Sequence, residues 1–253
     1  MKLIHKFKSP NFNERKSKEI NLIIIHYTAL KSVSESIEYL CNKQNKVSSH
    51  YLISKKGEIY NLVDEDKRAW HAGISYWKGN RDINSSSIGI ELDYFPDKKN
   101  TKYSKDLLNS LIKLLNKIVK KYNISKHNIL GHSDIAPYRK IDPGINFPWF
   151  LLEENRISFK IIKIPKNTQI QTLIQQWYKK NKFYSIKKKI LFFLDYIGYD
   201  VSLAKKNNSD FNKIMLVYSY RFQYFNKHLL NKKNISELIE THFLNILLTK
   251  LKK

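Results

Sequence analysis

The sequence predicts an α/β fold, in which a β-sheet is covered by helices, followed by a small all-α domain of three helices. Up to residue 149, short apolar runs rich in β-branched residues alternate with amphipathic stretches, a pattern typical of strands interleaved with helices. From residue 155 the sequence becomes mixed and polar, and then only helical periodicity remains. The predicted units are a domain over residues 1–155, a linker over 156–172 and a helical domain over 173–253.

The composition is that of a folded globular protein. The chain has 253 residues, of which 42% are hydrophobic and 13% aromatic. This length can bury a substantial core, and this composition is far from that of a disordered chain.

The first predicted strand covers residues 22–25, an apolar run too short for a helix and rich in isoleucine. It places His26 at the carboxyl end of a strand that is buried on both faces. Residues 33–44 are predicted to be helical because their apolar positions lie on one side of a helix. These positions are Val33, Ile37, Leu40 and Cys41.

A hairpin and a further strand are predicted in the middle of the first domain. Residues 49–63 contain two alternating segments around a Lys-Gly turn signal at 56–57. A loop rich in Gly, Asn and Ser over 70–87 leads into the short apolar run of residues 87–93. This run is predicted to be a buried strand that carries Glu91.

The strongest helical signal lies between residues 103 and 122, where apolar residues recur at steps of three and four. Asn123 is suited to end this helix. The final strand of the domain is predicted over residues 128–132 and ends on His132, after which a loop rich in Gly and Pro follows. The apolar positions of the helix are Leu107, Leu108, Leu111, Leu114, Leu115, Ile118, Val119 and Tyr122.

The carboxyl-terminal part is predicted to contain three amphipathic helices, over residues 186–197, 209–226 and 234–250. The turn of residues 198–200 and the Lys/Asn stretch of residues 227–233 separate them. Their periodicity indicates a small helical bundle.

The formal net charge of +24 comes from 46 basic and 22 acidic residues. A charge of this size favours attraction to anionic polymers. However, the basic residues are spread along the chain, and only six are arginine, the residue favoured for reading base edges. We therefore expect a solvated basic surface and no specific nucleic-acid partner.

Cysteine content and hydropathy narrow the class of protein. Cys41 is the single cysteine, which excludes an internal disulfide and a thiolate metal cluster. Residues 1–20 lack the apolar run of a secretory signal, and no transmembrane segment is expected elsewhere. These features predict a cytoplasmic protein; a periplasmic or envelope location reached by a non-classical route is the alternative. The oligomeric state is not predicted.

Four of the eight histidines lie beside polar or glycine-rich turns in the predicted sheet region: His26, His50, His71 and His132. Two of these, His26 and His132, follow the ends of short apolar strands, where loops gather functional groups at one sheet edge. Asp142 lies ten residues beyond His132, across a loop that contains Pro137, Pro143 and Gly144. Two imidazoles and one carboxylate, with one position left for water, form a catalytic zinc shell.

Two further side chains are candidates for the chemistry. Glu91 stands within a buried apolar strand, where a carboxylate needs a specific role, and it is the candidate base. Lys140, two residues before Asp142, is the candidate for stabilising an oxyanion. A salt-bridged Glu91 and a solvated Lys140 are the structural alternatives.

Four segments in this order resemble the zinc-dependent N-acetylmuramoyl-L-alanine amidases, the family that also includes peptidoglycan recognition proteins. They are IIIHYTA, VSSHYLISKKGEIYNLV, RAWHAGISYWKGNRDINSSSIGIELD and ILGHSDIAPYRKIDPGINFPW. The resemblance covers residues 18–150. It implies a mixed β-sheet flanked by helices, one Zn²⁺ per chain, and hydrolysis of the amide between the lactyl group of N-acetylmuramic acid and L-alanine of the stem peptide.

The resemblance also implies roles for individual residues. The zinc ligands would be His26, His132 and Asp142, while Glu91 and Lys140 would assist the attacking water and the tetrahedral intermediate. The remaining substrate-cleft positions are His50, Trp70 and His71, which would contact sugar or peptide; a packed Trp70 is the structural alternative.

The carboxyl-terminal helices resemble a three-helix peptidoglycan-binding-like module. The expected partners are peptidoglycan or soluble muropeptides, in wall turnover or recycling. A non-catalytic binder of peptidoglycan fragments is the alternative to an enzyme, and a charge-driven binder of nucleic acid is a third hypothesis. The sequence does not distinguish anhydro-muramyl from ordinary muramyl ends.

Overall fold

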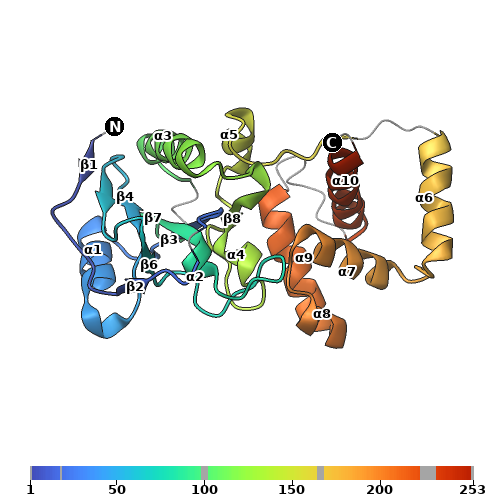
Figure 1. Cartoon of the computed structure of the whole chain (residues 1–253), viewed down its shortest axis with the longest axis horizontal. Helices are drawn as coiled ribbons and strands as arrows, with labels where there is room; N and C mark the ends of the chain where they lie inside the picture. Colours follow the sequence, from blue (N-terminus) through green and yellow to red (C-terminus); the bar gives the residue numbers. More distant parts are fainter. Residues whose placement is uncertain (1, 18, 98–101, 164–167, 223–231, 252–253) are drawn as a thin grey trace.

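The structure is a computed structural model that describes residues 2–17, 19–97, 102–163, 168–222 and 232–251 (Figure 1). Its strands are β1 (Leu3–Ile4), β2 (Phe12–Glu14), β3 (Leu22–Tyr27), β4 (Tyr51–Ile53), β5 (Ile59–Asn61), β6 (Lys67–Ala69), β7 (Ser87–Leu92) and β8 (Ile129–Gly131). Its α-helices are α1 (Val33–Cys41), α2 (Ile83–Ser86), α3 (Lys105–Tyr122), α4 (His132–Ile135), α5 (Trp149–Glu154), α6 (Thr168–Lys180), α7 (Ile186–Ile197), α8 (Ser202–Lys206), α9 (Asn208–Phe222) and α10 (Lys232–Leu251).

Six of the described strands form one mixed sheet in the order β1-β5-β4-β7-β3-β8, and β2 pairs with β6 in a separate antiparallel ribbon. Within the large sheet, β4, β7, β3 and β8 run parallel to their neighbours, while β4 and β5 form the antiparallel hairpin predicted from the sequence. The turn of this hairpin uses Gly57 at a φ of 81°, a conformation that favours glycine. The expectation of a mixed sheet flanked by helices is confirmed.

The central strand β3 separates two apolar layers because alternate side chains of a strand point to opposite faces. Ile23 and Ile25 pack in a core with α3 and α5. Leu22 and Ile24 belong to a second core, on the opposite side, which also contains the carboxyl-terminal helices. By the same alternation, His26 lies on the face of the sheet that these helices cover.

Helix α3 forms where its apolar stripe predicts. Its first turn is capped by Ser104, whose Oγ accepts the Leu107 N–H at 3.3 Å. Asn123 ends the helix in the left-handed conformation, with a φ of 51°. The side of the helix that faces the sheet buries Leu107, Leu111, Leu114, Leu115 and Ile118.

Three local elements differ from the sequence-based prediction. Helix α1 ends at Cys41, and residues 43–45 form a separate 3₁₀ turn, because Asn42 adopts an extended conformation and its side chain accepts the Gln44 N–H. The predicted loop over 70–87 contains the short strand-joining helix α2. The polar ribbon of β2 and β6 has no apolar alternation that would reveal it in the sequence.

The described residues beyond 167 form five helices, α6 to α10, rather than the predicted three. Helix α7 matches its predicted bounds, and α9 and α10 match in place. Helix α6 begins at Thr168, inside the stretch expected to be a linker. Residues 223–226 of the second predicted helix and most of the Lys/Asn stretch, 227–231, lie outside the described residues.

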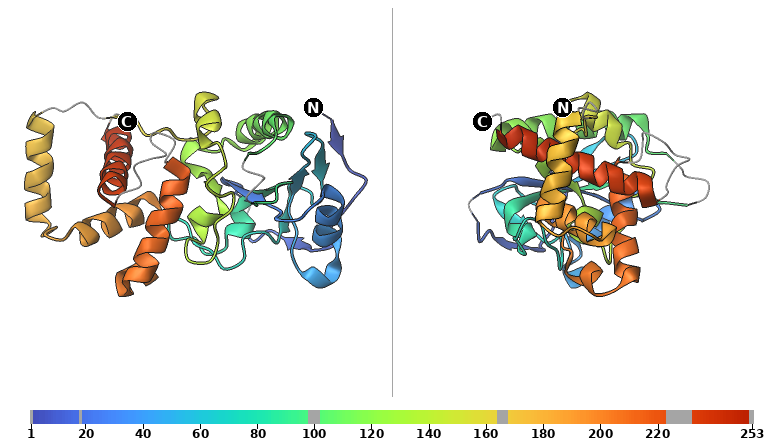
Figure 2. Two further views of the ribbon diagram at one scale, coloured as in Figure 1. Left: turned by 180° about the vertical axis from the view of Figure 1, so that it is seen from behind. Right: turned by 90° about the vertical axis from the view of Figure 1, so that its right-hand side faces the viewer.

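The helices α7, α9 and α10 pack against one another and against the sheet domain, whereas α6 lies at the end of the molecule away from the sheet (Figure 2). One apolar core contains Leu130 and Ile135 from the sheet domain together with Phe193, Tyr199 and Tyr218 from the helical part. Among the described residues, no helix is sufficiently long and apolar to cross a membrane.

Candidate active site

Three parallel strands bring the predicted chemistry to one sheet edge. His26, near the carboxyl end of β3, pairs in register with Glu91 on the neighbouring strand β7. On the other side of β3, Ile25 pairs with Gly131, so that His132 follows directly at the end of β8. Because the strands are parallel, their carboxyl ends meet at this edge.

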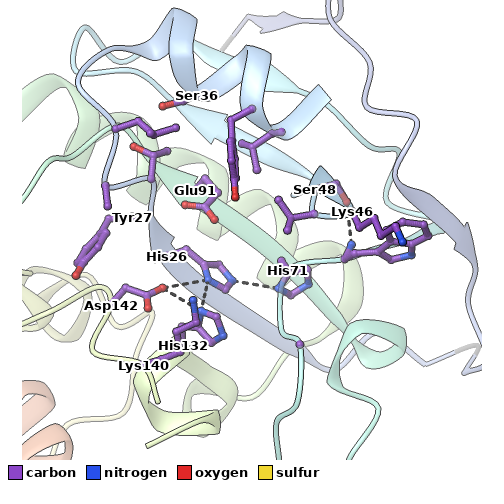
Figure 3. Close-up of a pocket in the computed structure, with 18 of the residues that line it drawn as sticks. His26, Tyr27, Ser36, Lys46, Ser48, His71, Glu91, His132, Lys140 and Asp142 are labelled. Carbon is purple, nitrogen blue, oxygen red and sulfur yellow. Dashed lines mark hydrogen bonds and ion pairs between the residues drawn. The ribbon is translucent and has the colours of Figure 1, made fainter. Parts of the chain in front are cut away.

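The three predicted ligands converge there (Figure 3). The Nδ1 atoms of His26 and His132 lie 3.0 Å apart, and Asp142 Oδ2 lies 3.2 Å from the first and 3.1 Å from the second. All three side chains are buried, and together they form a possible metal site among the described residues. The structure thus brings together the three residues that were predicted from the sequence to lie at one site.

A chain of hydrogen bonds behind His26 determines which of its nitrogens carries the proton. The Ser87 hydroxyl donates to the Ile83 carbonyl at 2.6 Å, so it accepts from His71 Nε2–H at 3.1 Å. His71 Nδ1 is then an acceptor and receives the His26 Nε2–H at 3.1 Å. The Nδ1 atom of His26 is therefore left with a lone pair directed at the ligand cluster.

His132 is oriented in the same sense by backbone. Its Nε2 lies 3.2 Å from the Ala72 carbonyl, which can only accept, so the proton is on Nε2 and the lone pair is on Nδ1. Arg139 Nη2 donates to the same carbonyl and approaches His132 Nε2 at 3.4 Å, so both donors share that oxygen. The Ser133 N–H donates to the Asp142 carbonyl at 2.9 Å, which ties the two ligand segments together.

The fit to a metal ion follows from this arrangement. Two imidazole lone pairs and a carboxylate oxygen face one another at 3.0–3.2 Å, which is unfavourable unless a cation lies among them. In a tetrahedral zinc site with bonds of about 2.0–2.1 Å, neighbouring ligand atoms lie about 3.3–3.4 Å apart. One carboxylate and two imidazoles are also a donor set that zinc uses in catalytic sites.

The ionisation of these groups agrees with a ligand role. Burial, followed by the neighbouring His132, lowers the pKa of His26 to about 4, so that the ring is neutral at pH 7. Burial alone would raise the pKa of Asp142, but His132 and His26 hold it below its ordinary value. A neutral imidazole and an ionised carboxylate are the forms that bind metal.

Glu91 lies above His26 on the same face of the sheet (Figure 3). Its Oε2 is buried and has no hydrogen-bond partner among the described residues, which is unusual for a carboxylate. Burial, and then the charge of Asp142, raises the pKa of Glu91 to about 8, while the charge of Lys140 opposes this shift. An unpartnered carboxylate directed toward a ligand cluster is available for proton transfer.

A pocket of about 650 Å³ opens over this cluster. Lys140 lines it, half-buried, on the same side as Asp142, and its charge acts on both Glu91 and His26. No salt bridge of Lys140 is found among the described residues, so its charge is not neutralised by a carboxylate partner there. The arrangement can therefore bind a carbonyl substrate between a cation site, a base and a lysine.

A family model described as N-acetylmuramoyl-L-alanine amidase matches residues 16–145, about half of the chain. The chain belongs to the N-acetylmuramoyl-L-alanine amidase family. The matched stretch contains all five residues of the cluster, from His26 to Asp142.

Curated relatives of this amidase-family chain include AmiD of Escherichia coli, which is 41% identical over 152 residues. That match covers 55% of this chain and 54% of AmiD, so the chain spans about half the length of this relative. The 1,6-anhydro-N-acetylmuramyl-L-alanine amidase AmpD of Haemophilus influenzae is 36% identical over 160 residues, which cover 56% of this chain and 85% of AmpD.

Solved structures of the amidase family extend the likeness to the helical part. AmiD of Escherichia coli, in complex with anhydro-N-acetylmuramic acid-L-Ala-D-γ-Glu-L-Lys, superposes with a TM-score of 0.72 at 28% identity, over 90% of this chain and 91% of that chain. AmpDh3 of Pseudomonas aeruginosa, in complex with anhydromuramic pentapeptide, has a TM-score of 0.69 at 27% identity, over 89% of both chains.

The three residues predicted to contact substrate occupy different places. Trp70 lines the pocket, and its Nε1 donates to Asn13 Oδ1 at 2.8 Å. His71 also lines the pocket, but both of its ring nitrogens are engaged, with His26 and with Ser87. Its principal contact is thus with a predicted metal ligand.

The structure does not bring His50 to the pocket. Its ring is fully buried; Nδ1 accepts the Gly89 N–H at 3.0 Å, and Nε2 faces the Lys67 carbonyl and Arg15. A histidine with both nitrogens bound to protein has no capacity left for a ligand. The placement of His50 is therefore structural and corrects the sequence-based expectation of a substrate contact.

Two residues that build the site, Asn84 and Gly89, are not predicted from the sequence. Asn84 Oδ1 accepts the N–H groups of His71 and Ala72, at 3.0 and 2.8 Å, and so sets the turn that carries His71. Gly89 is required opposite the same ring, since a Cβ there would lie 2.5 Å from His71 Cγ. Neither residue type signals such a role by spacing, because the contacts arise only in the fold.

Proposed function

We propose that the chain is a zinc-dependent N-acetylmuramoyl-L-alanine amidase. It would hydrolyse the amide between the lactyl group of N-acetylmuramic acid, in its ordinary or anhydro form, and L-alanine of the stem peptide. The observation that carries this proposal is the convergence of the lone pairs of His26, His132 and Asp142 beside an unpartnered Glu91. Membership of the family and the muropeptide bound to AmiD, a structural relative, support the choice of substrate.

The metal would be held by His26 Nδ1, His132 Nδ1 and Asp142 Oδ2, one ion per chain. When bound there, zinc supplies a Lewis acid that polarises the amide carbonyl and makes a water molecule more acidic.

Glu91 would act as the base. Burial raises the pKa of Glu91 to about 8 without a metal. A cation held at the three ligands, together with the charge of Lys140, would lower this pKa, so that the ionised carboxylate could accept a proton from the attacking water. The oxygen of that water forms a bond to the lactyl carbonyl carbon, and a tetrahedral intermediate results. Glu91 then returns the proton to the alanine nitrogen as the C–N bond breaks. The products are the muramyl sugar with a free lactyl carboxylate and a peptide with a free L-alanine amino group.

Lys140 would stabilise the negative oxygen of the tetrahedral intermediate. Lys140 lines the pocket together with Asp142. The attraction between its positive charge and the substrate oxygen is strongest when that oxygen carries a negative charge, as in the intermediate. Trp70, on the pocket wall, offers an apolar ring for the sugar or the peptide.

The test is to incubate the purified chain with anhydro-N-acetylmuramic acid-L-Ala-D-γ-Glu-L-Lys and, in parallel, with intact sacculi. We expect mass spectrometry to find peptides that begin with L-alanine, and Glu91→Gln to reduce their formation by about 10²–10⁴-fold with zinc still bound. A chain that binds the muropeptide but releases no peptide in either reaction would contradict the proposal and would favour a non-catalytic binder.

A further inference from the structure

The loop that carries two of the three candidate ligands rests directly on the carboxyl-terminal helices. This ligand loop, residues 131–142, begins at the end of β8, passes through α4 and ends at Asp142. Helix α4 contacts α9, and Ile135 of the loop lies in the same apolar core as residues of α7 and α9. The contact also includes a buried polar cluster.

Asp134, two residues after His132, is the centre of this polar cluster. Its Oδ2 accepts the Gly131 N–H at 2.7 Å and Arg221 Nη1 at 2.6 Å, and its Oδ1 accepts the Tyr199 hydroxyl at 2.5 Å. Asp134 and Tyr199 are each 1% exposed and Arg221 is 5% exposed. Both partners outside the loop come from the helical part of the chain.

Arg221, on α9, contacts the strand and the loop together. While Nη1 binds Asp134, Nη2 donates to the Ile129 carbonyl at 2.5 Å, at the start of β8. The guanidinium also lies 4.2 Å from the centre of the Trp149 ring. One arginine thus fixes the beginning of the strand relative to the turn that follows it, and His132 lies between these two points.

A second attachment lies further along the loop. The Tyr138 hydroxyl donates to the Asp200 carbonyl at 2.6 Å and accepts the Ala204 N–H at 3.2 Å. The ligand loop is therefore bound to the helical part on both sides of Ala136, before it returns to Asp142.

We infer that Asp134, Tyr199 and Arg221 are positioning residues for the metal site, through which the carboxyl-terminal helices hold His132 and Asp142 against His26. The inference rests on the proposed metal site but not on the proposed reaction. Gly131 packs closely against the residue that follows Asp142, since a Cβ there would lie 2.6 Å from Pro143 Cδ, so the two ends of the loop are in contact. A displaced α4 turn would separate the ligand atoms and weaken metal binding, as loss of groups that orient ligands does in other metal sites.

The decisive comparison uses two tyrosines of the same core. Tyr199→Phe removes the hydroxyl that binds Asp134, and Tyr218→Phe removes an equally buried hydroxyl that binds His242 Nδ1 at 3.0 Å. We expect Tyr199→Phe to weaken zinc affinity by about tenfold. Tyr218→Phe should leave the affinity within twofold of the parent chain. Zinc affinity is measured on the full chain by competition with a chromophoric chelator, after circular dichroism has established that each variant is folded.

Arg221 provides a second, graded test. Arg221→Met leaves the Asp134 carboxylate buried without its charge partner, whereas Arg221→Lys keeps the charge but cannot reach Asp134 and the Ile129 carbonyl together. We expect zinc affinity to be highest in the parent chain, lower in Arg221→Lys and lowest in Arg221→Met. The affinity of Arg221→Met should be about 10–100-fold below that of the parent. The double variant with Arg221→Met and Asp134→Asn removes both buried charges. It takes the place of Arg221→Met if that single variant does not fold.

Folded Tyr199→Phe and Arg221→Lys variants with parental zinc affinity would overturn the inference. A loss of affinity as large in Tyr218→Phe would do the same, because the effect would then be general loosening of the core. Because zinc is the only probe, the inference can stand even if no amide is hydrolysed. A parent chain that binds no zinc would instead refute the metal site itself.

Discussion

At the scale of single residues, the site is defined by where each imidazole carries its proton. His71 Nδ1 and the Ala72 carbonyl accept hydrogen bonds from the Nε2–H groups of His26 and His132, so the lone pairs of both Nδ1 atoms face Asp142. This places the three ligand roles on particular atoms and separates them from Glu91 and Lys140, which contact no ligand atom within hydrogen-bond distance among the described groups.

Lys140 and Asp142 should therefore fail in different ways. Asp142→Ala removes a ligand, so we expect loss of both bound zinc and activity. Lys140→Met should retain zinc and lower kcat by about 10²–10³-fold, because only stabilisation of the transition state is lost. Zinc content by atomic absorption and steady-state kinetics distinguish the two. A Lys140→Met variant without zinc would contradict the assignment.

The His71 and Ser87 pair should affect metal binding although neither would touch the ion. His71→Ala removes the acceptor of the His26 Nε2–H, and Ser87→Ala leaves the His71 Nε2–H without an acceptor. We expect zinc affinity to fall by about 10–100-fold in His71→Ala and by less in Ser87→Ala. Trp70→Ala, in the same pocket but bonded to no ligand, is the control and should keep its affinity. Unchanged affinity in His71→Ala would show that the hydrogen-bond chain does not orient His26.

The convergence of the three proposed ligands could be predicted because each histidine follows a short apolar strand and a stiff loop returns Asp142. It could not assign His50, which also lies beside a strand, because the difference between a pocket histidine and a buried one depends on the Gly89 N–H and Arg15. Those partners are distant in sequence, and only the fold brings them together.

At the scale of elements, helix α3 and strand β4 are joined by one carboxylate that does not line the pocket. Glu65 accepts the hydroxyls of Tyr51 and Tyr122, each at 2.8 Å, and Lys121 Nζ at 2.5 Å. Burial alone would raise the pKa of Glu65, but these bonds lower it below its ordinary value. A carboxylate with a lowered folded-state pKa stabilises the fold above its ordinary pKa, and this contribution is lost as the pH falls through the folded-state value.

Glu65→Gln should accordingly lower the melting temperature at pH 7 by about 3 °C, which corresponds to about 1 kcal/mol after allowance for solvent screening. The difference from the parent chain should shrink as the pH falls from the ordinary pKa of a glutamate through the lower pKa of folded Glu65, because the parental carboxylate is then protonated. Glu14→Gln, which removes an exposed partner of Lys67, should change the melting temperature little. A pH-independent difference would refute the electrostatic explanation.

Elements with strong periodicity could be predicted, and those without it could not. The apolar stripe of α3 and the isoleucine run of β3 identified both elements from sequence. By contrast, β2 and β6 are short and polar. Helix α6 begins in a segment rich in glutamine and threonine, whose composition is typical of a linker. Their formation depends on pairing and packing with distant residues rather than on local pattern.

At the scale of the whole molecule, the helical part is not an appendage of the sheet domain. One apolar core contains residues of β3, β8, α7, α9 and α10, and the buried pair of Asp134 and Arg221 crosses the same contact. The face of the sheet that carries His26 is therefore completed by the carboxyl-terminal helices. Both parts could be predicted from the sequence, but the packing of one against the other could not, because helical periodicity does not reveal which surface a helix covers.

The shared core predicts cooperative unfolding of the sheet and the carboxyl-terminal helices. Differential scanning calorimetry of the full chain should give one transition, with equal calorimetric and van't Hoff enthalpies. If two separate transitions were resolved, with the ligand loop intact after the first, the two parts would be independent domains.

The central claim is that one zinc ion, held by His26, His132 and Asp142, is required for cleavage of the muramyl–L-alanine amide. The most direct measurement strips the purified chain with a chelator and returns zinc stepwise while the release of L-alanine-initiated peptide from the anhydro-muramyl tripeptide is followed. Activity should vanish on stripping and rise in proportion to added zinc until one ion is bound per chain, and Asp142→Ala should not respond. Peptide release that persists in the stripped chain, or that zinc restores equally to Asp142→Ala, would contradict the account.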